Sequence, residues 1–157
     1  MAKTTRGTQA LKKLGVSFTV HGYDYDPDAD SAGLQAAEAL GEVPARVLKT
    51  LMAELDGKPV CAILPSDHEV SMKKLASALG GKSAEMMKPA AAERLTGYHV
   101  GGISPFGQKK RVPVVLQETA LEEPHVFINA GQRGFQIRLS PADAVRALDA
   151  VIADILA

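Results

Sequence analysis

Residues 47–64, VLKTLMAELDGKPVCAIL, decide the fold class of this 157-residue chain. Two runs rich in strand formers flank Asp56-Gly57, and an Asp-Gly pair in that setting is a strong signal for a tight hairpin turn. The sequence therefore predicts a strand over Val47–Leu55, a second strand over Pro59–Leu64, and antiparallel pairing between them.

Helices and further strands are predicted on both sides of this hairpin. Apolar residues at helical spacing, bounded by capping residues or glycines, predict the helices. These are Thr8–Leu14, Gly33–Leu40, a short turn at Pro44, Ser71–Leu79, Pro89–Leu95 and a last helix from Ser140-Pro141 that includes Ala144, Leu148, Val151, Ile152 and Ile155. The other predicted strands are Val16–Tyr23, Ser83–Met86, Pro113–Gln117, His125–Asn129 and Phe135–Leu139. The expected fold is α+β, a single domain over residues 1–157 with a mixed or largely antiparallel, curled sheet and helices around it.

The composition is that of an ordinary globular protein, with 46% hydrophobic and 23% charged residues. Eighteen basic residues balance eighteen acidic ones, so the whole chain lacks the positive surplus of a strong nucleic-acid binder. It contains neither an apolar run of membrane-spanning length nor a secretory signal pattern, so no membrane contact and a cytoplasmic location are expected. Cys61 is the single cysteine and the four histidines lie far apart, so no metal or other cofactor is expected.

Lys49 is the most informative single position. Alternate residues of a strand share a face, so Lys49 points the same way as Val47 and Leu51. A lysine on an apolar face is costly unless it is paired or stands at the mouth of a pocket. The pattern leaves two interpretations open: a pocket lysine, or an end-of-strand lysine whose aliphatic stem reaches to water.

The stretch Gly101-Gly102-Ile103-Ser104-Pro105-Phe106-Gly107 is the second candidate. Glycines let a backbone approach a ligand closely, which suits a carbonyl oxygen, an oxyanion or a terminal ribose. The spacing of two of its glycines matches a phosphate loop, but Gln108 stands where the lysine belongs, so a nucleotide triphosphatase is not expected. The other interpretation is a plain glycine-rich turn, and the residues alone favour it.

Two further segments carry weaker signals. Asn129–Gly134 joins two predicted strands and is either a hairpin turn, which its glycines favour, or a second wall of the same pocket. Lys109-Lys110-Arg111 is either solvated surface, the commoner case, or a holder of an RNA phosphate. Cys61 lies inside a predicted strand and is expected to be a buried structural thiol.

Several of these stretches together resemble the YbaK/EbsC branch of prolyl-tRNA editing domains. The resemblance follows the family's order and spacing over nearly the whole chain. It rests on Ser17-Phe18, His21, Tyr23, Val47–Leu51, Thr96–Tyr98, Val100–Arg111 and Gly131–Gly134. It implies a mixed sheet curled toward a barrel with surrounding helices, in agreement with the fold expected from the residues.

The resemblance implies a metal-free deacylase that removes cysteine wrongly attached to tRNA(Pro), with prolyl-tRNA synthetase as a transient partner. In the implied mechanism the substrate thiol attacks its own ester carbonyl, forms a four-membered thiolactone and expels the tRNA, so no catalytic triad is needed. By position, Lys49 and Gly101 are implied to be catalytic. Lys49 would hold the terminal phosphate or ribose or assist the leaving oxygen, and backbone N–H groups near Gly101 and Gly102 would face the carbonyl oxygen. The residues implied to bind substrate are Tyr23, Thr50, Gly102, Ile103, Ser104, Pro105, Asn129, Gly131 and Gln136.

Two positions depart from the family pattern. Asn129 stands where a serine is common, and Gln136 stands where an aspartate is found, although a glutamine cannot act as a base. Two alternatives therefore stay open: a deacylase of alanyl- or seryl-tRNA that uses water, and a non-catalytic module that docks on tRNA or on the synthetase. The neutral net charge predicts weak tRNA affinity for the chain alone, with specificity supplied by the synthetase.

Overall fold

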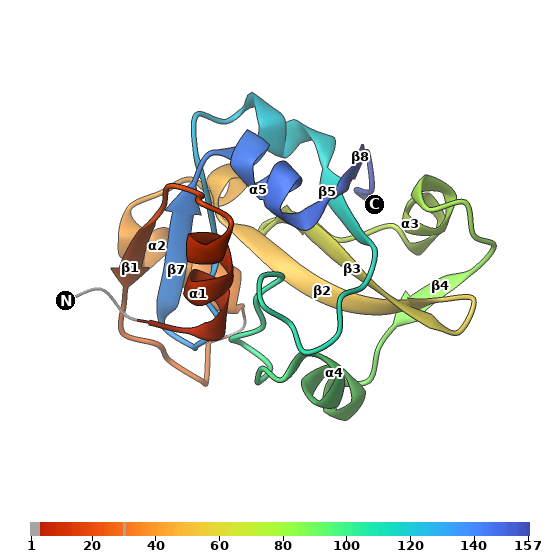
Figure 1. The fold of residues 1–157 in the computed structure, drawn as a ribbon, viewed down its shortest axis with the longest axis horizontal. Coiled ribbons are helices and arrows are strands. Elements are labelled where there is room, and N and C mark those ends of the chain that lie inside the picture. Colours follow the sequence, from red (N-terminus) through yellow and green to blue (C-terminus); the bar gives the residue numbers. More distant parts are fainter. Residues whose placement is uncertain (1–3, 30) are drawn as a thin grey trace.

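The computed structural model describes residues 4–29 and 31–157 and has the expected α+β architecture (Figure 1). The helices are α1 (Arg6–Lys13), α2 (Ala32–Leu40), α3 (Met72–Ala78), α4 (Pro89–Thr96) and α5 (Pro141–Leu148), with 3-10 turns η1 (Pro44–Arg46) and η2 (Glu118–Glu122). The strands are β1 (Thr19–Gly22), β2 (Leu48–Leu55), β3 (Lys58–Pro65), β4 (Ala84–Met86), β5 (Val114–Gln117), β6 (Val126–Asn129), β7 (Phe135–Leu139) and β8 (Val151–Ala153).

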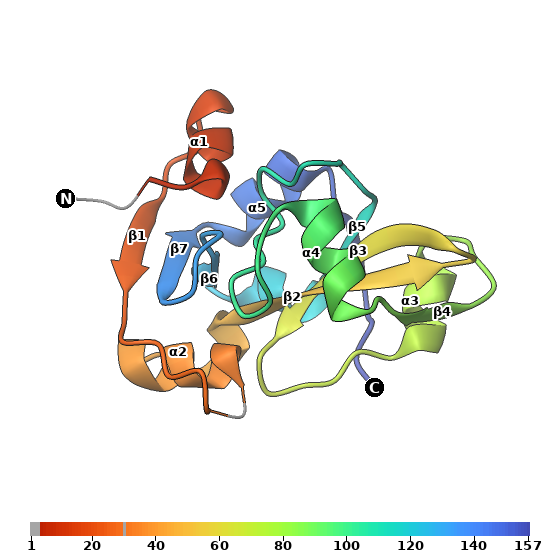
Figure 2. The same cartoon turned by 90° about the horizontal axis from the view of Figure 1, so that it is seen from below.

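The strands form two sheets that meet at the beginning of β2. The larger sheet has the order β4-β2-β3-β5-β8 and the smaller has the order β1-β7-β6. β3 pairs antiparallel with β2 but parallel with β5, so the larger sheet is mixed. A parallel bridge between Val47 and Phe127 joins the start of β2 to β6. The smaller sheet therefore stands beside one end of β2, and the two sheets do not close into a barrel over the described residues (Figures 1 and 2).

The predicted hairpin is confirmed, and its turn explains its register. Asp56 and Gly57 both have positive φ, 50° and 82°, which is the backbone conformation of the tightest hairpin turns. The Asp56 carboxylate also accepts hydrogen bonds from the N–H groups of Lys82 and Ser83, at 3.0 and 2.9 Å. The turn thereby fixes the β2–β3 pairing and holds the chain that leads into β4.

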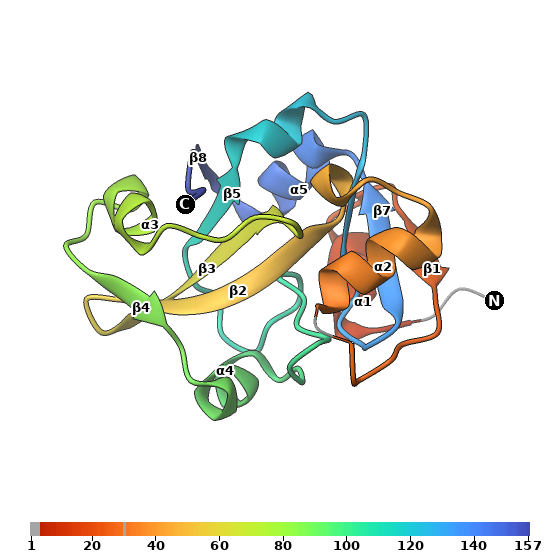
Figure 3. The ribbon, with the colours of Figure 1, turned by 180° about the vertical axis from the view of Figure 1, so that it is seen from behind.

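The two faces of β2 pack into different parts of the core. Leu48 and Met52 belong to the larger apolar cluster, whereas Ala53 belongs to a second cluster that includes Leu75 of α3. A third, small cluster forms where α2 lies across the smaller sheet, through contacts that include Val47 (Figure 3). The alternation along β2 thus places its odd-numbered residues on the α3 side of the larger sheet.

The last predicted helix is wrong beyond Leu148. α5 ends there because Asp149 adopts a left-handed conformation with φ 51°. The following residues form β8, which pairs with β5 through the partners Val115 and Val151. The apolar residues at helical spacing fit a strand because β5 offers a free sheet edge, and sheet pairing overrides the local helix signal.

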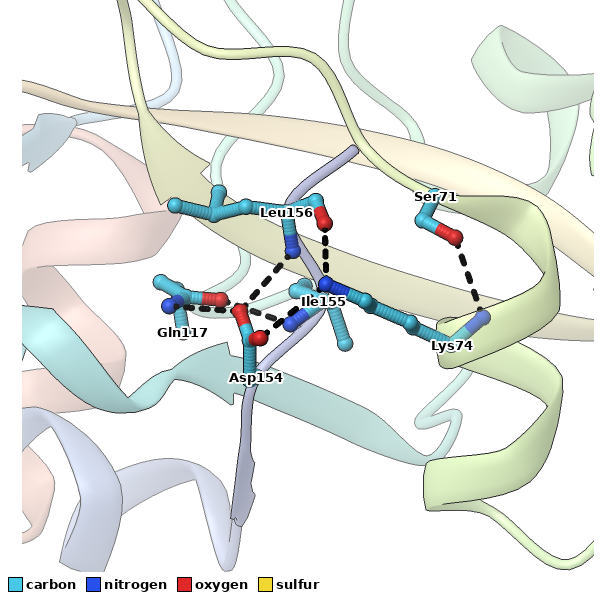
Figure 4. A network of polar contacts seen from close by, with 6 residues as sticks. All are labelled: Ser71, Lys74, Gln117, Asp154, Ile155 and Leu156. Carbon is cyan, nitrogen blue, oxygen red and sulfur yellow. Dashed lines mark hydrogen bonds and ion pairs between the residues drawn. The ribbon is translucent and has the colours of Figure 1, made fainter.

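A polar network fixes the segment after β8 (Figure 4). The side chain of Gln117 accepts a hydrogen bond from Ile155 N–H at 2.7 Å and donates one to Asp154 at 3.2 Å. The Lys74 ammonium donates to the Asp154 carboxylate at 3.1 Å and to the Leu156 carbonyl at 2.7 Å. The C-terminal segment is therefore held to α3 and β5 by side chains from both.

Two smaller differences concern the N-terminal part. The first strand is confined to Thr19–Gly22, the four residues that find partners on β7, although the prediction ran over residues 16–23. α1 begins before the predicted helix because Thr5 caps it in a capping box with Thr8. An acidic turn with Asp24, Asp26, Asp28 and Asp30 is expected after β1, and Asp30 lies outside the described residues. No helix in the described part of the chain has the length and apolarity needed to cross a membrane.

Candidate active site

A pocket of about 290 Å³ lies along the edge of β2 that does not pair with β3, which we call the outer edge. β3 covers the other edge of β2 along its whole length. On the outer edge, β6 approaches at Val47 and β4 pairs only from Ala53 onward. The stretch between these two contacts, residues 48–52, lines the pocket. The site is therefore a gap in the pairing of a central strand, closed over by loops and helix ends.

Thr50 stands in the middle of this gap. Its hydroxyl oxygen is buried and has no hydrogen-bond partner among the described residues. The Met52 carbonyl accepts a hydrogen bond from Met87 N–H on this same edge, at 3.1 Å. Since alternate residues of a strand turn their backbone groups to the same edge, the N–H and C=O of Thr50 also face the gap. The pocket floor thus offers polar backbone groups as well as a hydroxyl.

Lys49 also lines the pocket and brings a positive charge to it. Its side chain is 21% exposed, and its ammonium lies 3.8 Å from the carboxylate of Glu69, whose own side chain is 86% exposed. An ion pair at this distance with so exposed a partner contributes little to stability. The cation is therefore available to an anionic group of a ligand at the mouth of the pocket.

Asn129 and Gln136 are cross-strand partners on β6 and β7, so their side chains share a face. The Asn129 amide is occupied: it accepts from Gly131 N–H at 2.7 Å and donates to the Gly101 carbonyl at 3.3 Å. Gln136 is only 3% exposed, and its amide oxygen has no hydrogen-bond partner among the described residues. Asn129 therefore fastens the glycine loop to the β6–β7 turn, whereas Gln136 presents a free acceptor to the pocket.

Tyr23 lies behind Gln136 and not in the pocket lining. Its hydroxyl is buried without a hydrogen-bond partner in the described chain, and its backbone N–H donates to Gly134 at 2.9 Å. Burial raises the pKa of Tyr23, and the nearby Gln136 amide opposes this only in part. The phenol is therefore neutral at physiological pH and supports the wall that carries Gln136.

The glycine loop contributes Gly101 and Ile103 to the pocket. Gly101 has φ 91°, a conformation that favours glycine. The N–H of Gly102 donates to the His99 carbonyl at 2.8 Å. The Gly102 N–H is therefore paired within the turn. That N–H groups near Gly101 and Gly102 face the substrate's carbonyl oxygen, as the family resemblance implies, stays a prediction.

The rest of the loop is anchored away from the pocket. Ser104 is fully buried, and its hydroxyl accepts from Phe106 N–H at 3.2 Å. The Tyr98 hydroxyl donates to the Phe106 carbonyl at 2.6 Å, and burial raises the pKa of Tyr98 to about 12. Pro105 lines a separate, apolar pocket between the loop, α1 and α5. These contacts make the loop a fixed wall.

The structure thus gathers part of the predicted set in one place. The residues that line the pocket are Lys49, Thr50, Gly101, Ile103, Asn129 and Gln136. Those that lie outside its lining are Tyr23, Gly102, Ser104, Pro105 and Gly131. Cys61 is fully buried as expected, and burial raises the pKa of its thiol to about 12. The described residues include no group of three or more His, Cys, Asp or Glu side chains placed to hold a metal ion.

Sequence reasoning missed two parts of the pocket. One is the start of α2, where Ser31 accepts a hydrogen bond from Leu34 N–H at 3.3 Å and Gly33 lines the cavity. The other is an apolar wall of thioethers, Met52, Met86 and Met87. The serine cap was a visible signal for a helix start, but nothing local indicates that either segment faces β2.

Comparisons with known proteins identify the family and the fold. Residues 26–147 match the model of the aminoacyl-tRNA editing domain. A candidate Cys-tRNA(Pro)/Cys-tRNA(Cys) deacylase, EbsC of Enterococcus faecalis, is 37% identical over 143 residues, which cover 88% of this chain and 87% of that protein. The multifunctional Ser/Thr-tRNA deacylase ProXp-y of Escherichia coli is 27% identical over 155 residues, 93% and 92% of the two chains. The crystal structure of a candidate trans-editing enzyme for prolyl-tRNA synthetase superposes with a TM-score of 0.85 at 23% identity, covering 97% of this chain and 95% of that one.

Proposed function

Because the chain belongs to the aminoacyl-tRNA editing domain family, we propose that it is a free-standing deacylase that removes cysteine from mischarged tRNA(Pro). The whole chain, residues 1–157, acts as one editing domain in the cytoplasm, where mischarged tRNA arises. The observation that carries the proposal is the pocket at the β2 edge, which combines an apolar wall, unpaired polar groups and one available cation.

The pocket suits a small thiol side chain. Its volume of about 290 Å³ accommodates a small aminoacyl ester with part of the terminal ribose. Thioether sulfur is polarizable and packs well against other soft groups, and three methionines form one wall. The unpaired oxygens of Thr50 and Gln136 can accept hydrogen bonds from the substrate's α-ammonium group.

The proposed reaction uses the substrate's own nucleophile. The cysteine sulfur attacks the ester carbonyl carbon, the bond from that carbon to the ribose oxygen breaks, and the thiol proton passes to the leaving oxygen. The products are a four-membered thiolactone, which water later opens to cysteine, and tRNA with a free terminal hydroxyl. Because the nucleophile is already tethered to its target, much of the entropic barrier is removed. The protein therefore needs only to fold the substrate and to stabilise the developing oxyanion.

The described residues divide this work between the floor and the mouth of the pocket. The backbone N–H of Thr50 faces the gap and is placed to donate to the carbonyl oxygen as charge develops. Lys49 stands at the mouth of the pocket. When substrate binds, its ammonium leaves Glu69 and donates to a phosphate or ribose oxygen of the terminal nucleotide. Gln136 accepts from the ammonium group and, having no acidic proton, does not act as a base.

Deacylation of Cys-tRNA(Pro), Ser-tRNA(Pro) and Ala-tRNA(Pro) by the same protein tests the proposal. Only the cysteinyl ester is expected to turn over readily, and S-methylation of its thiol is expected to stop the reaction because the nucleophile is blocked. The matched control is the same S-methylated ester cleaved by mild base, which verifies that the ester itself stays labile. Faster release of serine or alanine, or release of S-methylcysteine, would replace thiol attack by attack of water.

Prolyl-tRNA synthetase is the proposed transient partner. The chain carries no net charge, so the selection of tRNA(Pro) is assigned to the synthetase that holds the mischarged product. Adding the synthetase is expected to raise the preference for Cys-tRNA(Pro) over Cys-tRNA(Cys). Equal preference with and without the synthetase would contradict this assignment without affecting the proposed deacylase activity.

A further inference from the structure

Four cations gather outside the pocket, at the far end of the glycine loop; we call Arg6, Lys109, Lys110 and Arg111 the basic surface. Arg6 lies on α1 and its guanidinium carbon stands 5.7 Å from the centre of the Tyr98 ring. A side chain on Gly97 would collide with the Arg6 guanidinium and the Lys109 stem together. The two cations are therefore neighbours, although more than a hundred residues separate them in the sequence.

The four side chains of the basic surface are exposed and form no ion pair with the described acidic residues, although Asp56 lines the same hollow as Lys110 and Arg111 and is occupied by the N–H groups of Lys82 and Ser83. Elsewhere Arg46 pairs with Glu42 and Glu123, and Arg146 with Asp143, whereas other exposed cations without an ion pair in the described chain, such as Lys73 and Lys82, are not neighbours of a second unpaired cation in the way that Arg6 and Lys109 are. Like charges that are held together without counter-charges repel each other, so this cluster has a stabilising role only toward an anion from outside.

Part of the clustering has a local explanation. Arg6 and Lys109 lie at the C-terminal end of α4, where Gly97 caps the helix, and cations are favoured at that end of a helix dipole. Lys110 and Arg111 lie beyond this helix end and line a different hollow near the β2–β3 turn. The helix dipole therefore accounts for two of the cations and not for all four.

The fold separates the charges even though the chain is neutral overall. The acidic turn that contains Asp26 is tied to α2, because Asp26 N–H donates to the Gln35 side chain at 2.6 Å. Figure 2 shows α1 and α2 on opposite sides of the smaller sheet. An anionic partner is thus attracted to the α1 side and repelled from the α2 side.

The basic surface and the pocket share one rigid loop. Gly101 and Ile103 line the pocket, and six residues later Lys109 N–H donates to the Thr96 carbonyl at 3.0 Å. The buried hydrogen bond from Tyr98 to Phe106 holds the chain between them. A molecule whose reacting end occupies the pocket therefore meets fixed positive charges along the same loop.

We propose that the basic surface binds the phosphate backbone of the tRNA acceptor stem while the aminoacyl end occupies the pocket. This rests on the proposed function, because it takes the ligand of the pocket to be an aminoacyl ester of tRNA. A duplex RNA carries regularly spaced phosphates, and such contacts supply affinity without reading sequence. The surface consequently strengthens binding to any acceptor stem and leaves the choice of amino acid to the pocket.

Two double variants, each of which removes two positive charges, test the proposal. The surface variant is Lys109→Ala/Lys110→Ala. The control variant is Lys73→Ala/Lys82→Ala, which removes exposed lysines of α3 and the loop after it. With Cys-tRNA(Pro), the surface variant is expected to raise KM about tenfold at about 0.15 M salt with kcat unchanged. With 2′(3′)-O-cysteinyl-adenosine, which fills the pocket but has no stem, both variants should match the wild type. The slope of log(kcat/KM) against log[salt] should become shallower by about 1 to 2 for the surface variant only.

Three kinetic outcomes would overturn the proposal. They are an unchanged KM for the charged tRNA, an equal loss with the adenosine ester, which would place the effect in the pocket, and an equal loss in the control.

Fluorescence anisotropy with an uncharged acceptor-stem hairpin measures RNA binding to the basic surface without any chemistry. If the wild type deacylates neither substrate, the proposed function fails, and the hairpin affinities of the two variants still decide whether the basic surface binds RNA. A surface variant that binds the hairpin normally but no longer binds the synthetase would assign the surface to a protein partner instead.

Discussion

Two buried glutamines of this protein have opposite surroundings. Gln117, 1% exposed, uses both ends of its amide: it accepts from Ile155 and donates to Asp154. Gln136, 3% exposed, leaves its amide oxygen without a partner among the described residues. The same side chain at the same burial thus uses its oxygen in the C-terminal network, whereas at the pocket the amide lies beside Tyr23 and leaves its oxygen unpaired.

The lysines of the two regions repeat the contrast. Lys74 donates to a carboxylate and a carbonyl within 3.1 Å, whereas Lys49 has an exposed partner at 3.8 Å. An unpaired buried acceptor costs stability, so a fold retains it where a ligand pairs with it. The C-terminal network therefore stabilises the fold, whereas the unpaired groups of the pocket destabilise the free protein and are available to a ligand.

The largest effect should appear when each lysine is removed in turn. Lys49→Ala is expected to lower kcat/KM for Cys-tRNA(Pro) by about tenfold to a hundredfold, because a hydrogen bond from a charged group to the terminal nucleotide contributes about 1.5–3 kcal/mol. Lys74→Ala should leave kcat/KM at the wild-type value, since Lys74 contacts only the C-terminal segment. Single-turnover deacylation measures both. Equal activity of the two variants would remove Lys49 from the mechanism.

Replacing each glutamine by leucine is expected to separate stability from activity. Gln117→Leu leaves the Ile155 N–H unpaired in the core and should lower the free energy of unfolding by about 1–3 kcal/mol. Gln136→Leu deletes an oxygen that has no partner together with the amide beside Tyr23, so it should destabilise the fold less than Gln117→Leu does, while deacylation weakens. Urea unfolding at neutral pH gives both values. A destabilisation of Gln136→Leu as large as that of Gln117→Leu would mean that its oxygen is paired.

The two hydroxyls give a smaller version of the same test. Ser71 caps α3 by accepting from Lys74 N–H at 3.2 Å, so Ser71→Ala should cost about 1 kcal/mol. The Thr50 hydroxyl is unpaired, and Thr50→Val keeps its shape and its strand preference. This variant should be at least as stable as the wild type and bind substrate less well. A loss of stability in Thr50→Val would sink the interpretation of the gap as a ligand site.

The smallest effect concerns acid. Hydrogen bonds from Lys74, Leu156 and Gln117 hold the pKa of Asp154 below its usual 3.8. A carboxyl whose pKa is lower in the folded state stabilises the fold above its unfolded pKa, and this stability is lost as the pH falls through the folded value. Asp154→Asn is therefore expected to lower the unfolding midpoint near neutral pH and to flatten its decline below about pH 4. Parallel pH profiles for the variant and the wild type would contradict this.

The sequence predicts what depends on neighbours in the chain. The β2–β3 hairpin, the Ser71 cap and the stop at Gly41 follow from turn and cap chemistry, and all are confirmed. Val151 and Ile152 continue the helical spacing of α5 but join β5 as a strand, because the free edge that accepts them is formed by residues far away in the sequence. Local pattern contains no information about that edge.

The same limit applies to the pocket. Lys49 was noticeable because a charge interrupts an apolar face, and the glycine loop because of its composition. Met86, Met87 and Gly33 carry no such signal, since each is an ordinary residue at the end of an ordinary element. That they face one gap is a consequence of how β4 and β6 divide the edge of β2.

The gap in that edge also bears on aggregation. Unpaired strand edges invite other chains to add a strand, and proteins commonly protect them with charges or by covering them. Here the open stretch is bounded at one end by β6 and at the other by β4, and the Met52 carbonyl already accepts from Met87 N–H. Residues 48–51 stay open, which is fewer than the roughly five or six residues of a typical strand. The edge is therefore open to a few polar atoms of a small ligand and closed to a second polypeptide, so the site stays receptive without making the protein prone to self-association.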